Sequence, residues 1–67
     1  MAEGVAFHEY DPKNQLLAIR FDGGEVYLYS GVPQDVADGM KWATAVGVSA
    51  GNYFHKYIRD KYRAVKH

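Results

Sequence analysis

A run of turn-forming residues, Asp22-Gly23-Gly24, separates two segments in which apolar side chains recur at every second position. Asp-Gly and Gly-Gly pairs supply the backbone conformations that a tight β-hairpin requires. Residues 16–21 precede the turn and residues 25–30 follow it, and both have the two-residue period of a strand with one buried face. The pattern predicts an antiparallel hairpin, around which the rest of this short chain must pack.

The register of the hairpin decides which side chains share a face, because neighbouring residues of a strand point to opposite sides. Whichever two of the three turn residues form a two-residue turn, Val26 and Leu28 lie on the same face as the aliphatic residues of the preceding strand. We therefore expect Tyr27 and Tyr29 on the opposite face, together with Arg20.

Residues 5–10 have the pattern of a further strand, and residues 11–14 contain the Pro and Asn of a turn. A five-residue loop would place Val5 and Phe7 on the aliphatic face, whereas a four-residue loop would reverse that assignment. The first thirty residues therefore predict a three-stranded antiparallel meander.

Two helices are expected after the sheet. Pro33 favours a helix start, and residues from Val36 to Ala43 supply an apolar stripe. Ser49 is a typical N-cap for a last helix over about residues 50–65. The predicted fold class is α+β, a three-stranded antiparallel meander followed by two helices packed on one face. The expected core consists of Val5, Phe7, Leu17, Ile19, Phe21, Val26, Leu28, Val36, Met40, Phe54 and Ile58.

The size and composition of the chain exclude several classes of function. It has 67 residues and no cysteine, so it forms no disulfide and no thiolate metal site. A domain this small buries only about 60% of the surface of its unfolded chain, which leaves little volume for a water-excluding catalytic pocket. The three histidines lack the spacing of metal ligands. We therefore expect no catalytic residue, no metal ion and no cofactor.

The same residues bear on location and domain organisation. The N-terminal residues have neither the basic region nor the apolar core of a signal peptide. No apolar run approaches the roughly 18 residues of a membrane span, and no repeat or linker divides the chain. We expect one domain over residues 1–67, a cytoplasmic location and no membrane partner.

Residues 47–51 match G-x-S-x-G, the nucleophile motif of large α/β hydrolases. That motif requires a buried parallel strand and partner residues that a chain of this length does not hold. Ser49 is therefore interpreted as a helix cap. The free amides near Ser49 and Gly51 could also bind a phosphate at the start of the helix.

The net charge is zero, but the charges are unevenly distributed. Residues 1–40 carry seven acidic and two basic groups, and residues 41–67 carry six basic groups and one acidic group. On the predicted last helix, Lys56, Arg59 and Arg63 form part of a basic stripe. The stripe indicates an anionic partner, although cations also stabilise the end of a helix by interacting with its dipole.

The predicted tyrosine face is a second candidate surface. Tyr27, Tyr29 and Arg20 would form an aromatic, partly basic platform of the kind on which RNA-binding sheets stack unpaired bases. The alternative is that these tyrosines pack under the helices or in a dimer interface.

Many of these residues form a pattern that resembles the KTSC domain over about residues 5–62. The domain occurs alone in bacteria and phages and at the C-terminus of some lysyl-tRNA synthetases, and RNA binding is proposed for it. The resemblance implies an accessory binding domain that is not an enzyme. The pattern is Tyr10-Asp11, Leu17-x-Ile19-x-Phe21, Gly24, Tyr27-Leu28-Tyr29, Gly31-Val32-Pro33, Ser49-x-Gly51-x-Tyr53-Phe54, Ile58-Arg59 and Tyr62.

Two functional hypotheses remain open at this point. The first is a non-catalytic module that binds RNA, including tRNA, or another single-stranded nucleic acid. The second is a protein-interaction or self-association module, such as a homodimer, that uses the same aromatic side chains. Binding through phosphates weakens steeply as the salt concentration rises, whereas an aromatic interface should persist.

Overall fold

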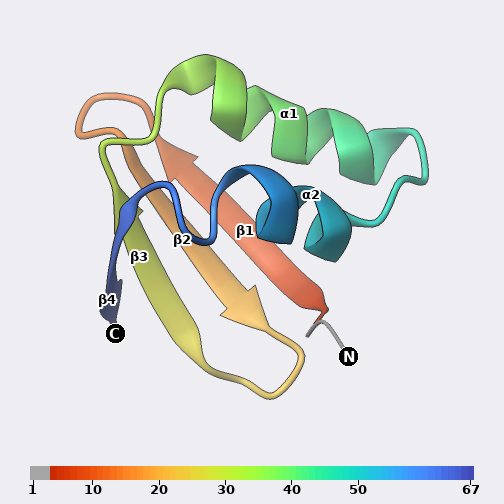
Figure 1. Cartoon of the computed structure of the whole chain (residues 1–67), viewed down its shortest axis with the longest axis horizontal. Helices are drawn as coiled ribbons and strands as arrows, with labels where there is room; N and C mark the ends of the chain where they lie inside the picture. The colour runs from red at the N-terminus through yellow and green to blue at the C-terminus, as the bar shows by residue number, and fades with distance from the viewer. Residues whose placement is uncertain (1–3) are drawn as a thin grey trace.

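The computed structural model describes residues 4–67 and contains a four-stranded antiparallel sheet and two helices. The strand order is β1-β2-β3-β4, and both helices lie on the same side of the sheet (Figure 1). The predicted α+β class is confirmed, and a fourth strand extends the meander. The elements are β1 (Val5–Asp11), β2 (Leu16–Phe21), β3 (Val26–Ser30), α1 (Gln34–Ala45), α2 (Ala50–Tyr57) and β4 (Arg63–Lys66).

The cross-strand pairing continues from Arg20–Val26 to Phe21 and Glu25, which leaves a loop of three residues, 22–24. Both of the predicted two-residue turns are therefore wrong. The Phe21 N–H donates to the Glu25 carbonyl at 2.9 Å, and the Gly24 N–H donates to the Phe21 carbonyl at 2.8 Å. Gly24 has a φ of +94°, the left-handed conformation that closes loops of this length. One additional loop residue shifts β3 by one position and exchanges its two faces.

Because of this shift, the tyrosines of β3 lie on the face that the helices cover. Tyr27 pairs with Ile19 and Tyr29 pairs with Leu17, whose side chains are fully buried. Tyr29 is only 5% exposed, and its ring lies 5.3 Å from that of Phe54 in an edge-on contact. The expectation that both tyrosines lie on an open face is wrong.

The β1–β2 loop has four residues, the second of the two alternatives. Asp11 pairs with Leu16, which places Tyr10 on the helix-covered face and Phe7 on the opposite one. An irregularity between Val5 and Phe7 shifts the register, and Val5 then packs against the core. The Asp11 carboxylate accepts a hydrogen bond from the Asn14 side-chain amide at 2.8 Å and further ones from the Lys13 and Asn14 backbone N–H groups, and these lower its pKa.

The core lies between the sheet and the helices and agrees only in part with the prediction. Val5 and Val36 are half-buried against it. Phe7, Val26 and Leu28 were expected inside, but Phe7 is 53% exposed and the other two lie half-buried on the opposite face of the sheet. The buried residues are Leu17, Ile19, Phe21, Tyr29, Val32, Ala37, Met40, Ala43, Phe54 and Ile58.

The last helix is shorter than predicted. α2 ends at Tyr57, not near residue 65, and the chain turns and returns as β4. Residues 58–65 contain no Gly or Pro and have good helix propensity. However, β4 pairs with the free edge of β3 from Ser30 to Tyr27, and Ile58 is fully buried. Tertiary pairing therefore overrides the local preference for a helix.

α1 and α2 approach closely at Gly39. A Cβ atom at this position would collide with the ring and hydroxyl of Tyr53. The Tyr53 hydroxyl donates to the Val36 carbonyl at 3.1 Å, which fixes the ring across α1. Gly39 lowers the helix propensity of α1, but its lack of a side chain lets Tyr53 of α2 pack against α1.

The loop geometry predicts different effects of alanine at two adjacent glycines. Gly24→Ala should lower the free energy of unfolding by about 1–2 kcal/mol, because an L-residue is strained at positive φ. A Cβ atom at this position meets nothing within 4 Å, so the effect comes from the backbone alone. Gly23→Ala is the matched control and should be neutral or slightly stabilising. Urea unfolding measures both, and equal effects would contradict the three-residue loop.

A second substitution tests the helix contact. Gly39→Ala should lower the free energy of unfolding by about 1–3 kcal/mol through overpacking, although alanine normally stabilises a helix. Asp38→Ala, at the exposed neighbouring position, should change it by no more than about 0.5 kcal/mol. Thermal unfolding compares the two variants. Stabilisation by Gly39→Ala would show that Tyr53 does not lie over this position.

Candidate functional site

The predicted tyrosine platform is not formed. Tyr29 is buried and Tyr27 is half-buried beneath the helices, with its ring edge-on to Phe21 at 5.8 Å. Arg20 is exposed on the opposite face of the sheet, where it pairs with Val26. The structure therefore separates Arg20 from the two tyrosines, and a base cannot stack on the buried ring of Tyr29.

The predicted basic stripe is divided among three elements. Lys56 lies on α2, Arg59 in the connection that follows, and Arg63 at the start of β4. All three are exposed, as is Lys61 between them. They are close in sequence but do not form one helix face, because α2 ends before the last two. Their binding to phosphate remains a prediction.

The predicted helix cap is confirmed. The Ser49 hydroxyl accepts the Asn52 N–H at 3.2 Å, and Gly51 is buried in the first turn of α2. Because the Ser49 oxygen already accepts one of the free N–H groups at the start of α2, the structure adds no support for a phosphate site there.

Exposed aromatic side chains line a groove between α1 and α2. It encloses about 320 Å³ and is lined by Trp42, Val48, Asn52, Tyr53, Lys56 and Tyr57. Trp42 is 59% exposed and Tyr57 is 45% exposed. We call these six residues the aromatic groove. Large aromatic side chains at such exposure indicate a contact surface rather than a core.

The tyrosine side of the groove is held in place. The Tyr53 and Tyr57 rings lie 4.7 Å apart with an interplanar angle of 42°, and Tyr53 is fixed by its hydrogen bond to the Val36 carbonyl. Burial raises the pKa of Tyr53, so its hydroxyl stays protonated as a donor. The Lys56 ammonium lies 5.4 Å from the centre of the Tyr57 ring. A flat ligand with a negative group would find stacking surfaces and a cation within one site.

Trp42, Asn52 and Tyr57 were missed by the sequence analysis. A signal for Trp42 was present, because it lies outside the Val36–Met40–Ala43 stripe of its own helix. A tryptophan on the polar side of an amphipathic helix points away from the core, so its side chain is expected to be exposed. Tyr57 gave no such signal, because its spacing in the predicted last helix puts it on the same face as the expected core residues Phe54 and Ile58.

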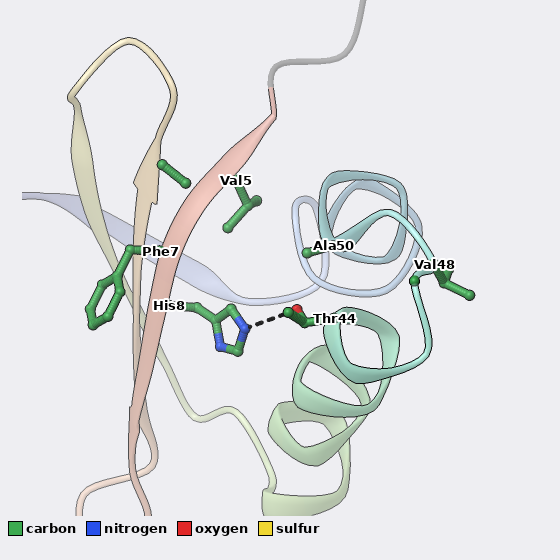
Figure 2. Close-up of a pocket in the computed structure, with 8 residues that line it drawn as sticks. Val5, Phe7, His8, Thr44, Val48 and Ala50 are labelled. Atoms are coloured by element: carbon green, nitrogen blue, oxygen red, sulfur yellow. Dashed lines mark hydrogen bonds between the residues drawn. The ribbon is translucent and has the colours of Figure 1, made fainter.

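A second hollow of about 350 Å³ lies between β1 and the α1–α2 connection, and its lining includes Val5, His8, Thr44 and Ala50 (Figure 2). His8 Nε2 lies 3.4 Å from Thr44 Oγ1, and that hydroxyl donates to the Met40 carbonyl at 3.1 Å. The proton of Thr44 is therefore directed to the backbone, and His8 must carry its own proton on Nε2. Such a pair lacks the arrangement in which a histidine activates a hydroxyl nucleophile.

The charge state of His8 follows from its surroundings. Burial lowers the pKa of His8, and the nearby Lys41 ammonium lowers it further. Because this pKa lies below the ordinary value of 6.5, the imidazole is mainly neutral near pH 7. Within residues 4–67, no three His, Cys, Asp or Glu side chains are grouped so as to hold a metal ion. No helix in that range is long and apolar enough to cross a membrane.

Comparisons of the sequence with known proteins find a family and several relatives. The model of the KTSC domain matches residues 5–62. A protein of Tsukamurella paurometabola is 41% identical over 56 residues, which cover 84% of this chain and 78% of that protein. Lysine–tRNA ligases of Nostoc sp. and Trichormus variabilis are 36% and 38% identical over 59 and 56 residues. The match covers 88% and 84% of this chain but only 10% and 9% of the ligases.

The His8–Thr44 contact predicts a pH dependence of stability. Because the pKa of His8 is lower in the folded chain, the unfolded chain binds the proton more readily as the pH falls below about 6.5. Between about pH 7.5 and pH 5, unfolding free energy should therefore decrease more in the parent chain than in His8→Gln. Urea unfolding at both pH values measures this. His67→Gln, at an exposed terminal position, is the control and should keep the parent's pH dependence; an unchanged dependence in His8→Gln would contradict the account.

Proposed function

The chain belongs to the KTSC domain family, and from that membership we propose that it is a non-catalytic accessory domain that binds single-stranded RNA. The observation that carries the proposal is the aromatic groove, in which Trp42 and Tyr57 are exposed beside Lys56. Part of the support comes from the ligase relatives, whose name states that they act on tRNA and in which the related segment is about a tenth of the chain.

The chemistry of the groove suits an unpaired base. Bases stack on exposed aromatic rings, and each stacked base contributes about 1–3 kcal/mol. The Asn52 side chain can both donate to and accept from the edge of a base. Base pairing would hide that edge and keep the ring in a duplex stack, so the groove favours single strands and loops.

The phosphates of such a strand would meet positive charge next to the groove. Lys56 lies within it, and the exposed Arg59 comes two residues after the end of α2. Basic side chains that neutralise phosphates release bound counterions, which makes the affinity depend on salt. Residues 41–67 carry six basic groups and one acidic group, and this net positive charge also favours binding of phosphates.

The proposal is tested with the intrinsic fluorescence of Trp42, the chain's single tryptophan. Titration with single-stranded RNA oligonucleotides and with tRNA should quench its emission to saturation, whereas a fully paired RNA duplex should quench weakly. Unchanged emission with all three at low salt, or equal quenching by the duplex, would overturn the proposal.

Substitutions separate stacking from charge. Tyr57→Ala should weaken RNA binding by about 10-fold, and Trp42→Ala by a similar factor when measured with labelled RNA. Lys56→Gln and Arg59→Gln should each reduce the salt slope by about 0.7. Lys13→Gln removes the same charge from the β1–β2 loop and should leave the slope unchanged. Circular dichroism checks that each variant is folded. An equal loss of RNA affinity in all five variants, Lys13→Gln included, would contradict binding in the aromatic groove.

A further inference from the structure

The sheet face opposite the helices is largely apolar, and no element within residues 4–67 covers it (Figure 1). Phe7 and Val65 on it are 53% and 58% exposed, although each lies in a strand. Cross-strand pairing identifies the six apolar residues of this face, which we call the open sheet face: Phe7, Leu16, Ala18, Val26, Leu28 and Val65.

The register arranges the open sheet face in rows that run across the strands. One row contains Asp11, Leu16, Ser30 and Arg63, and the next contains Glu9, Ala18, Leu28 and Val65. A third contains Phe7, Arg20 and Val26. The middle of the face is therefore aliphatic, while charges lie mainly on its two outer strands.

The charges on the outer strands have opposite signs. β1 presents Glu9 and Asp11, and β4 presents Arg63. Lys66 of β4 belongs to the other face and forms an ion pair with Glu25 at 3.3 Å. The acidic strand and the basic strand are separated by the two central strands, so the face has an acidic edge and a basic edge.

Such a face complements itself under one two-fold rotation. A two-fold axis parallel to the strands places β1 of one copy over β4 of the other and keeps the rows aligned. Asp11 then faces Arg63 twice, and Glu9 lies one row away from it. An axis perpendicular to the strands would place β1 over β1 and bring carboxylates together. A symmetric dimer requires a patch that is complementary to itself. The open sheet face meets this requirement only when the two-fold axis is parallel to the strands.

We propose that the open sheet face binds a second copy of this chain, forming a two-layer sandwich with the two-fold axis parallel to the strands. Sheets pack in this way about 10 Å apart, with their strands within about 30°. Arg20 lies in an end row, where its stem can pack while its charged group stays in water. Oligomerisation is also a common way in which domains of this size gain stability.

The size of the face is that of a weak interface. Four strands about 4.8 Å apart and three rows of side chains span roughly 19 by 20 Å. Two such faces bury on the order of 1,000 Å², a size at which weak and transient complexes are common. We therefore expect a dissociation constant in the micromolar range, within reach of sedimentation velocity.

Charge reversal tests both the surface and the axis. Glu9→Lys and Arg63→Glu should each weaken the dimer by about 10-fold, because the first places a cation one row from Arg63 and the second places a carboxylate opposite Asp11. The double variant restores the attraction between positions 9 and 63 with the signs exchanged. It should recover part of the affinity, since Asp11 keeps its charge. Lys61→Glu, in the connection before β4, makes the same charge change away from the face and should have little effect. All three positions concerned are exposed, so the fold should survive.

Val65→Asp provides an independent test of the apolar centre and should yield a folded monomer at all concentrations. Trp42→Ala, in the aromatic groove, should leave the dimer unchanged, which separates this proposal from RNA binding. A monomeric parent chain at several hundred micromolar would overturn the proposal. A dimer that survives Val65→Asp, or that the double charge reversal fails to recover, would overturn it as well.

Discussion

The fold depends on the three-residue loop between β2 and β3. Its left-handed residue, Gly24, closes the loop at a length that differs by one residue from the commonest hairpins. That single residue determines the face on which every side chain of β3 lies. It places Tyr27 and Tyr29 under the helices and leaves Leu28 on the opposite face. The core, the open sheet face and the exclusion of a tyrosine platform all follow from this register.

With the tyrosines inside, much of the family pattern is explained by packing. Tyr29 is edge-on to Phe54, the Tyr10 hydroxyl donates to the Val32 carbonyl at 2.6 Å, and Tyr53 lies across α1. Each ring fills core volume while its hydroxyl can remain near the rim, as is typical of tyrosines in small domains. The surfaces for which we propose functions are therefore built largely from residues outside that pattern, such as Trp42 and Val65.

The sequence predicted the strands and helix starts well, because alternation, Pro33 and Ser49 are local signals. It did not predict the register, since Asp22-Gly23-Gly24 is compatible with loops of two or three residues. It also could not predict β4, because residues 58–65 favour a helix locally, whereas Arg63–Lys66 form a strand by pairing with β3. The candidate site was misplaced for the same reason. An error of one residue in a loop moved two tyrosines from the surface to the core.

The most direct test is a proton NMR measurement of contacts between side chains. The account predicts strong nuclear Overhauser effects between the rings of Tyr29 and Phe54, whose centres lie 5.3 Å apart. It predicts none between the Leu28 methyl groups and Phe54, because Leu28 lies on the other side of the sheet. The opposite result, with Leu28 in contact with Phe54 and the Tyr29 ring free of such contacts, would contradict the register and everything derived from it.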